Sequence, residues 1–126
     1  MPREDLLAGL DVLLIEDETM VSFLIEEMLA QLGATSIRHA ARVEVGSALL
    51  DAKLPSFAIL DVNLAGETVF PLAERLQAAG VPFVFITGYG REGLHGQWIS
   101  CEVLQKPLTA MEFEQGIRRI LKIPPG

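Results

Sequence analysis

Short, wholly apolar runs alternate along this chain with longer stretches in which apolar residues recur every three or four positions. A short apolar run that stops at polar residues is typical of a strand buried on both faces of a sheet. Spacing of three and four predicts amphipathic helices. The expected strands are 12–15, 36–40, 57–60, 83–86 and 103–105. The expected helices are 19–32, 43–52, 67–79, 91–98 and 110–121.

Proline and glycine modify two of these helices. Pro71 cannot lie deep inside a helix, because its ring removes one backbone hydrogen bond and clashes with the preceding turn. The regular part of the third helix is therefore expected to begin near Phe70. The stretch 91–98 contains Gly93 and Gly96, so its helical pattern is ambiguous and a mobile segment is the alternative.

Five strands that alternate with five helices predict an α/β fold with a parallel sheet, right-handed crossovers and helices on both faces. For a chain of 126 residues, this pattern indicates a doubly wound, flavodoxin-like domain with strand order 2-1-3-4-5. We expect the domain to span 10–122, with an N-terminal extension at 1–9 and a C-terminal tail at 123–126.

Composition narrows the range of partners. The formal net charge is −7 and the pI about 4.7, which disfavours nucleic-acid binding.

The single cysteine, Cys101, fits a reducing cytoplasm, and no apolar run reaches the length of a membrane span. His39 and His95 have no neighbours at metal-ligand spacing, which favours surface or packing roles.

Acidic residues follow two of the expected strands. Glu16 and Asp17 come directly after the first strand, with Glu18 beside them, and Asp61 ends the third. In the predicted topology these two strand ends flank the point where strand order reverses, which is where such folds bind ligands. Two carboxylates about 4 Å apart repel by about 4 kcal/mol at an effective dielectric of about 20. A hard divalent cation such as Mg²⁺ would offset that repulsion.

The remaining strand ends supply a hydroxyl and an ammonium. Thr87 ends the fourth strand and Lys106 follows the fifth. A carboxylate nucleophile with a metal, a hydroxyl and an ammonium suits phosphoryl transfer to a carboxylate, which depends on positioning and charge neutralisation. Alone, Asp61 could be a turn residue and the acids a solvated strand end. Their joint presence with Thr87 and Lys106 favours the phosphoacceptor interpretation.

Four segments in this order resemble the receiver domains of two-component response regulators. They are 13–18 (LLIEDE), 57–66 (FAILDVNLAG), 85–88 (FITG) and 106–108 (KPL). The resemblance covers 10–121. It implies that Asp61 accepts a phosphoryl group, and that Glu16, Asp17, Asp61 and the backbone carbonyl of Asn63 bind Mg²⁺.

The same resemblance implies that Thr87 hydrogen-bonds one phosphoryl oxygen, that Lys106 pairs with another, and that the peptide bond before Pro107 is cis. The segment 82–89 also resembles a group of single-domain receivers with a Phe-Ala-Thr-Gly-aromatic motif, associated with stress-response phosphorelays. Val103 stands where many receivers place an aromatic switch residue that works with Thr87. We therefore take Tyr89 as the candidate substitute.

The resemblance implies a stand-alone, cytoplasmic bacterial receiver that catalyses only its own phosphorylation and dephosphorylation. A histidine kinase or a histidine phosphotransfer protein would donate the phosphoryl group, and an unknown protein would receive the signal. No nucleic acid or membrane partner is expected, and a homodimer through 110–122 stays open. Alternative functions are a phosphate sink, a relay intermediate, a small Mg²⁺-dependent phosphohydrolase, and an unphosphorylated interaction module or FMN binder.

Overall fold

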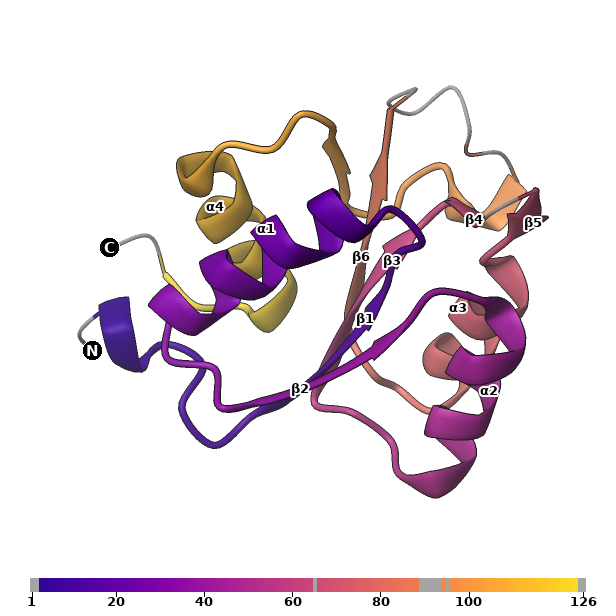
Figure 1. Cartoon of the computed structure of the whole chain (residues 1–126), viewed down its shortest axis with the longest axis horizontal. Helices are drawn as coiled ribbons and strands as arrows, with labels where there is room; N and C mark the ends of the chain where they lie inside the picture. The colour runs from indigo at the N-terminus through magenta and orange to yellow at the C-terminus, as the bar shows by residue number, and fades with distance from the viewer. Residues whose placement is uncertain (1–2, 65, 89–93, 95, 125–126) are drawn as a thin grey trace.

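The computed structural model describes residues 3–64, 66–88, 94 and 96–124 (Figure 1). The main strands are β1 (Asp11–Ile15), β2 (Ser36–Ala40), β3 (Phe57–Asp61), β6 (Phe83–Thr87) and β7 (Val103–Gln105). The helices are α1 (Thr19–Gln31), α2 (Val43–Ala52), α3 (Phe70–Ala78) and α4 (Ala110–Leu121). Two-residue strands β4 (Asn63–Leu64) and β5 (Glu67–Thr68) form a separate antiparallel pair.

The main sheet is parallel throughout, with strand order β2-β1-β3-β6-β7. This order confirms the predicted flavodoxin-like topology. Every residue of β1 and of β3 is buried, because helices cover both faces of these inner strands. The wholly apolar runs in the sequence reflect this two-sided burial.

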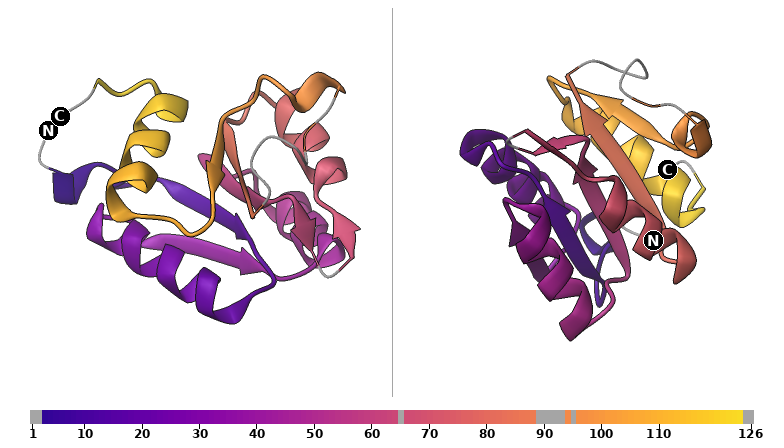
Figure 2. Two further views of the ribbon diagram at one scale, coloured as in Figure 1. Left: turned by 90° about the horizontal axis from the view of Figure 1, so that it is seen from above. Right: turned by 90° about the vertical axis from the view of Figure 1, so that its right-hand side faces the viewer.

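Helices α1 and α4 cover one face of the sheet, and α2 and α3 cover the other (Figures 1 and 2). Successive side chains of β1 point to opposite faces. Val12 and Leu14 pack in the core under α1 and α4, whereas Leu13 and Ile15 pack in the core under α2 and α3. The sheet therefore separates two apolar cores. The polar residues that follow the strands lie at the ends of the sheet, outside both cores.

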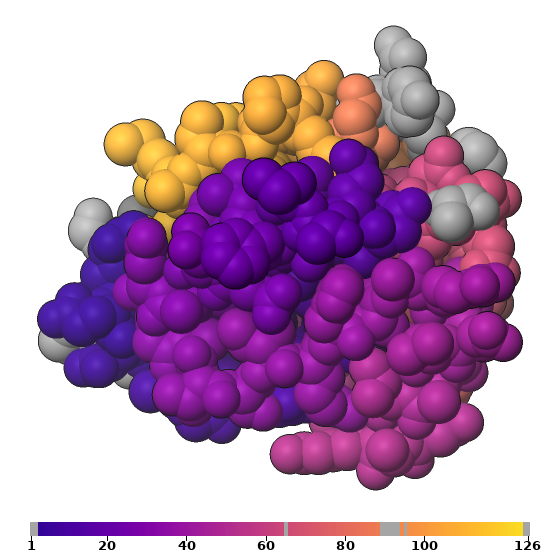
Figure 3. All heavy atoms as spheres, in the orientation of Figure 1, coloured from indigo at the N-terminus to yellow at the C-terminus, as the bar shows by residue number. Residues whose placement is uncertain are grey.

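The segment before β1 contributes to the first of these cores. Leu6 and Leu7 are buried there, and the Leu7 amide donates to the Leu32 carbonyl at 2.8 Å. Arg3 forms an ion pair with Glu114 of α4. Figure 3 shows these first residues (indigo) against the end of α1 (purple). The structure thus packs the N-terminal extension onto the body of the domain.

The expected start of the third helix is confirmed, because α3 begins at Phe70 with Pro71 in its first turn. Of the expected helix at 91–98, residues 91–93 and 95 lie outside the described residues, and 96–98 is not α-helical. Four α-helices, rather than five, occur in the ranges that the structure describes. Gly96, at φ +63°, begins a short 3-10 turn that ends at Trp98. A left-handed residue is compatible with a turn and interrupts an α-helix.

Residues 89–93 and His95 lie outside the described residues, so the predicted mobile segment stays a prediction. No helix in the described ranges is long and apolar enough to span a lipid bilayer.

Candidate functional site

A polar pocket of about 190 Å³ lies at the carboxyl end of the sheet. The ends of three strands supply residues of its wall, because β3 ends at Asp61, β6 ends at Thr87, and Lys106 follows β7. This is the edge at which parallel α/β sheets bind ligands. The residues that line the pocket are Glu18, Asp61, Asn63, Thr87, Gly88 and Lys106.

Three carboxylates converge beside this pocket. Glu16, Glu18 and Asp61 each contribute an oxygen, and these oxygens all lie within 4.8 Å of one another. Glu16 is fully buried and Asp61 is 3% exposed, whereas Glu18 is exposed. One oxygen of Glu16, Oε2, accepts a hydrogen bond from the Glu18 amide at 3.0 Å. The other, Oε1, accepts no hydrogen bond from any residue that the structure describes.

The Lys106 ammonium lies among these carboxylates. Its Nζ donates to Glu18 Oε1 at 3.0 Å and to Asp61 Oδ2 at 3.2 Å. It also lies 3.1 Å from Glu16 Oε1, where the two groups form an ion pair without hydrogen-bond geometry. One ammonium thus faces three carboxyl groups, two of them on buried side chains.

Burial shifts the ionisation of these groups. Loss of solvent, together with the adjacent Asp61 carboxylate, raises the pKa of Glu16 to about 8. Burial also raises the pKa of Asp61, although hydrogen bonds from its neighbours and the charge of Lys106 act against the shift. Burial disfavours the charged form of Lys106, but the three carboxylates more than offset this effect, so its pKa is raised.

Backbone groups hold the remaining site residues. The Asn63 amide donates to Asp61 Oδ1 at 3.3 Å, and the Lys106 amide donates to the Thr87 carbonyl at 2.9 Å. Thr87 is buried and lines the pocket. The peptide bond between Lys106 and Pro107 is cis. Asp61, Thr87, Lys106 and Asn63 are therefore brought together at one pocket.

The remaining predicted site residues are Asp17, Val103 and Tyr89. Asp17 is half-buried, and its carboxylate is not one of the three that the structure groups within the described residues. Val103 is half-buried on β7 and packs against the core under α2 and α3. An isopropyl side chain cannot hydrogen-bond a threonine, so Val103 offers no polar coupling to Thr87. Tyr89, the proposed substitute, lies outside the described residues.

Two contacts were missed from the sequence. The sequence predicts Glu18 only near the site, yet its side chain accepts a hydrogen bond from Lys106 directly. His39, expected at the surface or in packing, lies at the end of β2 with its Nε2 2.7 Å from the Glu16 carbonyl. The run of three acids was the available signal for Glu18. His39 carried no local signal, because its contact depends on the pairing of β1 with β2.

The donor set suits a hard cation. Carboxylate oxygens are the ligands that Mg²⁺ and Ca²⁺ prefer. A fully buried carboxylate oxygen that accepts no well-aligned hydrogen bond is costly to maintain. Glu16 Oε1 is such an atom among the described residues, although the Lys106 ammonium lies 3.1 Å from it in an ion pair. The acidic cluster of Glu16, Glu18 and Asp61 is thus compatible with a metal site.

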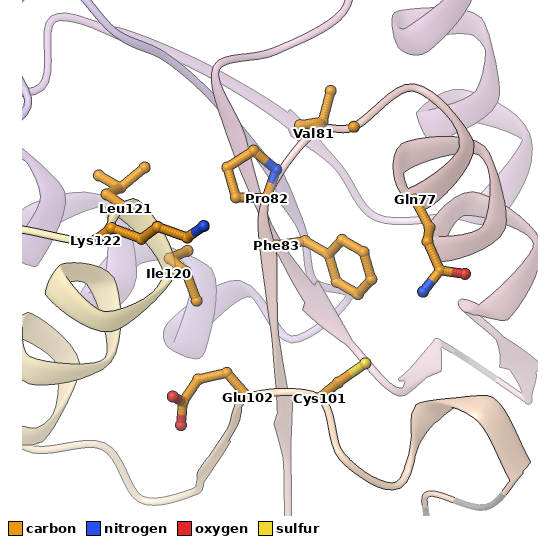
Figure 4. Close-up of a pocket in the computed structure, with 10 residues that line it drawn as sticks. Gln77, Val81, Pro82, Phe83, Cys101, Glu102, Ile120, Leu121 and Lys122 are labelled. Atoms are coloured by element: carbon orange, nitrogen blue, oxygen red, sulfur yellow. The ribbon is translucent and has the colours of Figure 1, made fainter.

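A larger pocket, of about 600 Å³, lies at the opposite, amino end of the sheet. Residues from the end of α3, the starts of β6 and β7, and the end of α4 line it (Figure 4). Its wall includes Phe83, Cys101 and Ile120, with Glu102 and Lys122 beside them. Glu102 forms an ion pair with Arg119 at 2.6 Å. This amino-end pocket gathers none of the strand-end residues described above.

The chain is similar to several solved structures. SdrG from Sphingomonas melonis Fr1 is 33% identical over 88% of this chain and 95% of that one, with a TM-score of 0.80. The REC domain of the PhyR response regulator from Erythrobacter litoralis is 25% identical over 93% of each chain, also with a TM-score of 0.80. A CheY-like response regulator receiver domain from Methylobacillus flagellatus shares the fold at 19% identity, over 87% of this chain and 97% of that one, with a TM-score of 0.74. No family model and no curated protein matches the chain.

Proposed function

This chain belongs to the receiver family of response regulators, and on that premise we propose that it signals by accepting a phosphoryl group on Asp61. One observation carries the proposal. The buried Asp61 carboxylate faces a pocket, 3.2 Å from the Lys106 ammonium and grouped with two further carboxylates. A nucleophilic oxygen, a cation and a space for a phosphoryl group thus meet at one place.

Transfer proceeds by attack of an Asp61 oxygen on the phosphorus of a phosphohistidine. The new O–P bond forms as the N–P bond breaks, and the imidazole leaves with the electron pair of that bond. Lys106 neutralises charge on one phosphoryl oxygen, and the Thr87 hydroxyl donates to another. Both act mainly by position and charge, which is how enzymes promote phosphoryl transfer.

Glu16 and Asp61 would hold a Mg²⁺ ion, with Asp17 and the Asn63 carbonyl as the further ligands that family membership implies. When bound, the ion neutralises charge on the transferring oxygens. Glu16 Oε1, which is buried and accepts no well-aligned hydrogen bond from the described residues, supports this assignment. Hydrolysis of the acyl phosphate would return Asp61 to its carboxylate, so the chain would catalyse only its own phosphorylation and dephosphorylation.

We propose a histidine kinase or a histidine phosphotransfer protein as the donor, and a protein as the receiver of the signal, both in a bacterial cytoplasm. The exposed side chains of Met20, Phe23 and Leu24 support a protein donor. They lie in the first two turns of α1, at spacings of three and four residues that place them on one side of the helix. Glu18, at the pocket mouth, directly precedes them, so a donor that reaches Asp61 would contact this side of α1.

Intact mass after incubation with acetyl phosphate and Mg²⁺ tests the proposal. We expect a gain of one phosphoryl group that is absent with EDTA and absent in Asp61→Asn. Asp51→Asn is the matched control, because it removes an exposed carboxylate on α2 that pairs only with Arg75 among the described residues; it should be phosphorylated like the wild type. A gain of equal size in Asp61→Asn would refute the assignment.

A further inference from the structure

The Lys106 ammonium is engaged by carboxylates on three sides before any phosphoryl group arrives. It donates to Glu18 and to Asp61, and it forms an ion pair with Glu16. A lysine ammonium has three donors and no acceptor. If Lys106 pairs with a phosphoryl oxygen, as the proposed function requires, that oxygen must compete with the carboxylates for the same ammonium.

The three competitors differ in how readily they release Lys106. Glu16 is fully buried, so water does not replace Lys106 at its carboxyl group when that ion pair opens. Asp61 itself carries the phosphoryl group and stays beside Lys106. The Glu18 side chain is 62% exposed, so water replaces Lys106 at little cost when the pair opens. Glu18 is therefore the partner that gives way.

The backbone around Glu18 supports a specific role for its side chain. Glu18 occupies the N-cap position of α1, yet its carboxylate forms no capping hydrogen bond in the described structure. Acidic side chains near a helix N-terminus ordinarily interact favourably with the free amides of the first turn. Here the carboxylate is directed across the pocket mouth to a residue 88 positions away in sequence.

We propose that Glu18 is a positioning residue that holds Lys106 in the unphosphorylated protein and competes with the phosphoryl group for its ammonium. Phosphorylation exchanges one ion pair for another, because a phosphoryl oxygen replaces Glu18 Oε1 at Lys106 Nζ. Glu18 thereby lowers the affinity of the site for a phosphoryl group, and so lowers the stability of the phosphorylated state. This inference rests on the proposed function of the same site.

Titration with beryllofluoride, a phosphoryl mimic, tests the competition at Mg²⁺ concentrations that saturate each variant. Binding is followed by the amide resonances of Thr87 and Gly88. Glu18→Gln should lower the Kd by about two- to fivefold, the range expected for a partly exposed ion pair. Glu27→Gln removes the same charge from an exposed position on α1 and should leave the Kd unchanged.

A double-mutant cycle separates competition from general charge. In a Lys106→Met background, Glu18→Gln should no longer change the Kd, because the contested ammonium is gone. An equal effect in both backgrounds, or an unchanged or higher Kd in Glu18→Gln alone, would overturn the inference. If the wild type binds no beryllofluoride, the proposed function and the competition both fail. A shift of the Lys106 ammonium resonance in ligand-free Glu18→Gln would then show only that the ion pair between Lys106 and Glu18 forms in solution.

Discussion

The two ends of the sheet carry pockets of opposite character. The amino-end pocket is the larger, at about 600 Å³, and its wall combines Phe83 and Cys101 with charged groups at its rim. The carboxyl-end pocket is about 190 Å³, but it lies against the buried carboxylates of Glu16 and Asp61 and the ammonium of Lys106. Pocket volume alone would select the amino end, whereas buried charge selects the carboxyl end, where we propose that phosphoryl transfer takes place.

The two pockets differ in the free-energy cost of their charged groups. The amino-end pocket needs little compensation, because Lys122 is exposed and the partly exposed Glu102 is paired with Arg119. Buried carboxylates close together raise the free energy of the folded state unless a cation offsets them. A fold retains such a cluster where it serves a purpose, so perturbed buried acids indicate a functional site. We therefore expect substitutions at the two ends to differ, most strongly where they remove the buried charge.

Substitution of the lysine at each end should affect the phosphorylation rate very differently. Lys106→Met should slow phosphorylation from acetyl phosphate by at least about 100-fold, because it removes a donor that neutralises charge on the transferring oxygens. Lys122→Met, at the amino-end pocket, should change the rate by less than about twofold. Intact mass over time measures both rates. Equal losses in the two variants would mean that the ends are not functionally distinct.

Substitution of a glycine near each end should affect the free energy of unfolding differently. Gly33 has φ +95°, and a Cβ there would strike the backbone carbonyl of Glu4. Gly33→Ala should therefore lower the free energy of unfolding by at least about 2 kcal/mol. A Cβ on Gly88 meets no described atom within 4 Å, so Gly88→Ala should change stability by less than about 0.5 kcal/mol. Urea unfolding measures both, and a neutral Gly33→Ala would contradict the packing of the N-terminal segment.

Stability should depend on pH through the carboxyl end. The pKa of Glu16 is raised from 4.5 to about 8 in the folded chain, so between these values the native state binds more protons than the unfolded state. Its stabilising contribution is therefore present at low pH and is lost as pH rises from about 4.5 to about 8. A tenfold change in the acid dissociation constant between the folded and unfolded chains corresponds to about 1.4 kcal/mol.

The comparison of wild type with Glu16→Gln in EDTA isolates this effect. The stability of the wild type relative to the variant should fall by at least about 1.4 kcal/mol across that range, as measured by urea unfolding at several pH values. A relative stability that is flat or rises with pH would show that Glu16 is not held against ionisation.

Much of this architecture followed from local patterns. Apolar runs that stop at acids predicted β1 and β3, and the strand order then placed Asp61 beside the acids that follow β1. Pro71 predicted the start of α3, because a proline is tolerated only in the first turn of a helix. These features depend on short stretches of chain, or on topological rules that hold for nearly all parallel sheets.

Other features depend on distant contacts. The sequence pattern predicts only an extension at Leu6 and Leu7, because nothing in the first few residues reveals a core completed by α1 and α4. Glu18 was recognised as acidic, but its bond to Lys106 joins residues 88 positions apart. The 3-10 turn ending at Trp98 depends on tertiary packing, where the indole stacks on Phe70 with ring centroids 5.6 Å apart.

Chemical mapping of the modified residue would distinguish Asp61 from every other acceptor. Borohydride reduces an aspartyl phosphate to homoserine, so peptide mass spectrometry after phosphorylation and reduction identifies the residue that carried the phosphoryl group. We predict homoserine at position 61, dependent on Mg²⁺ and absent without the phosphodonor. Reduction at Glu16 or Asp17 instead, with Asp61 unchanged, would contradict phosphorylation at Asp61.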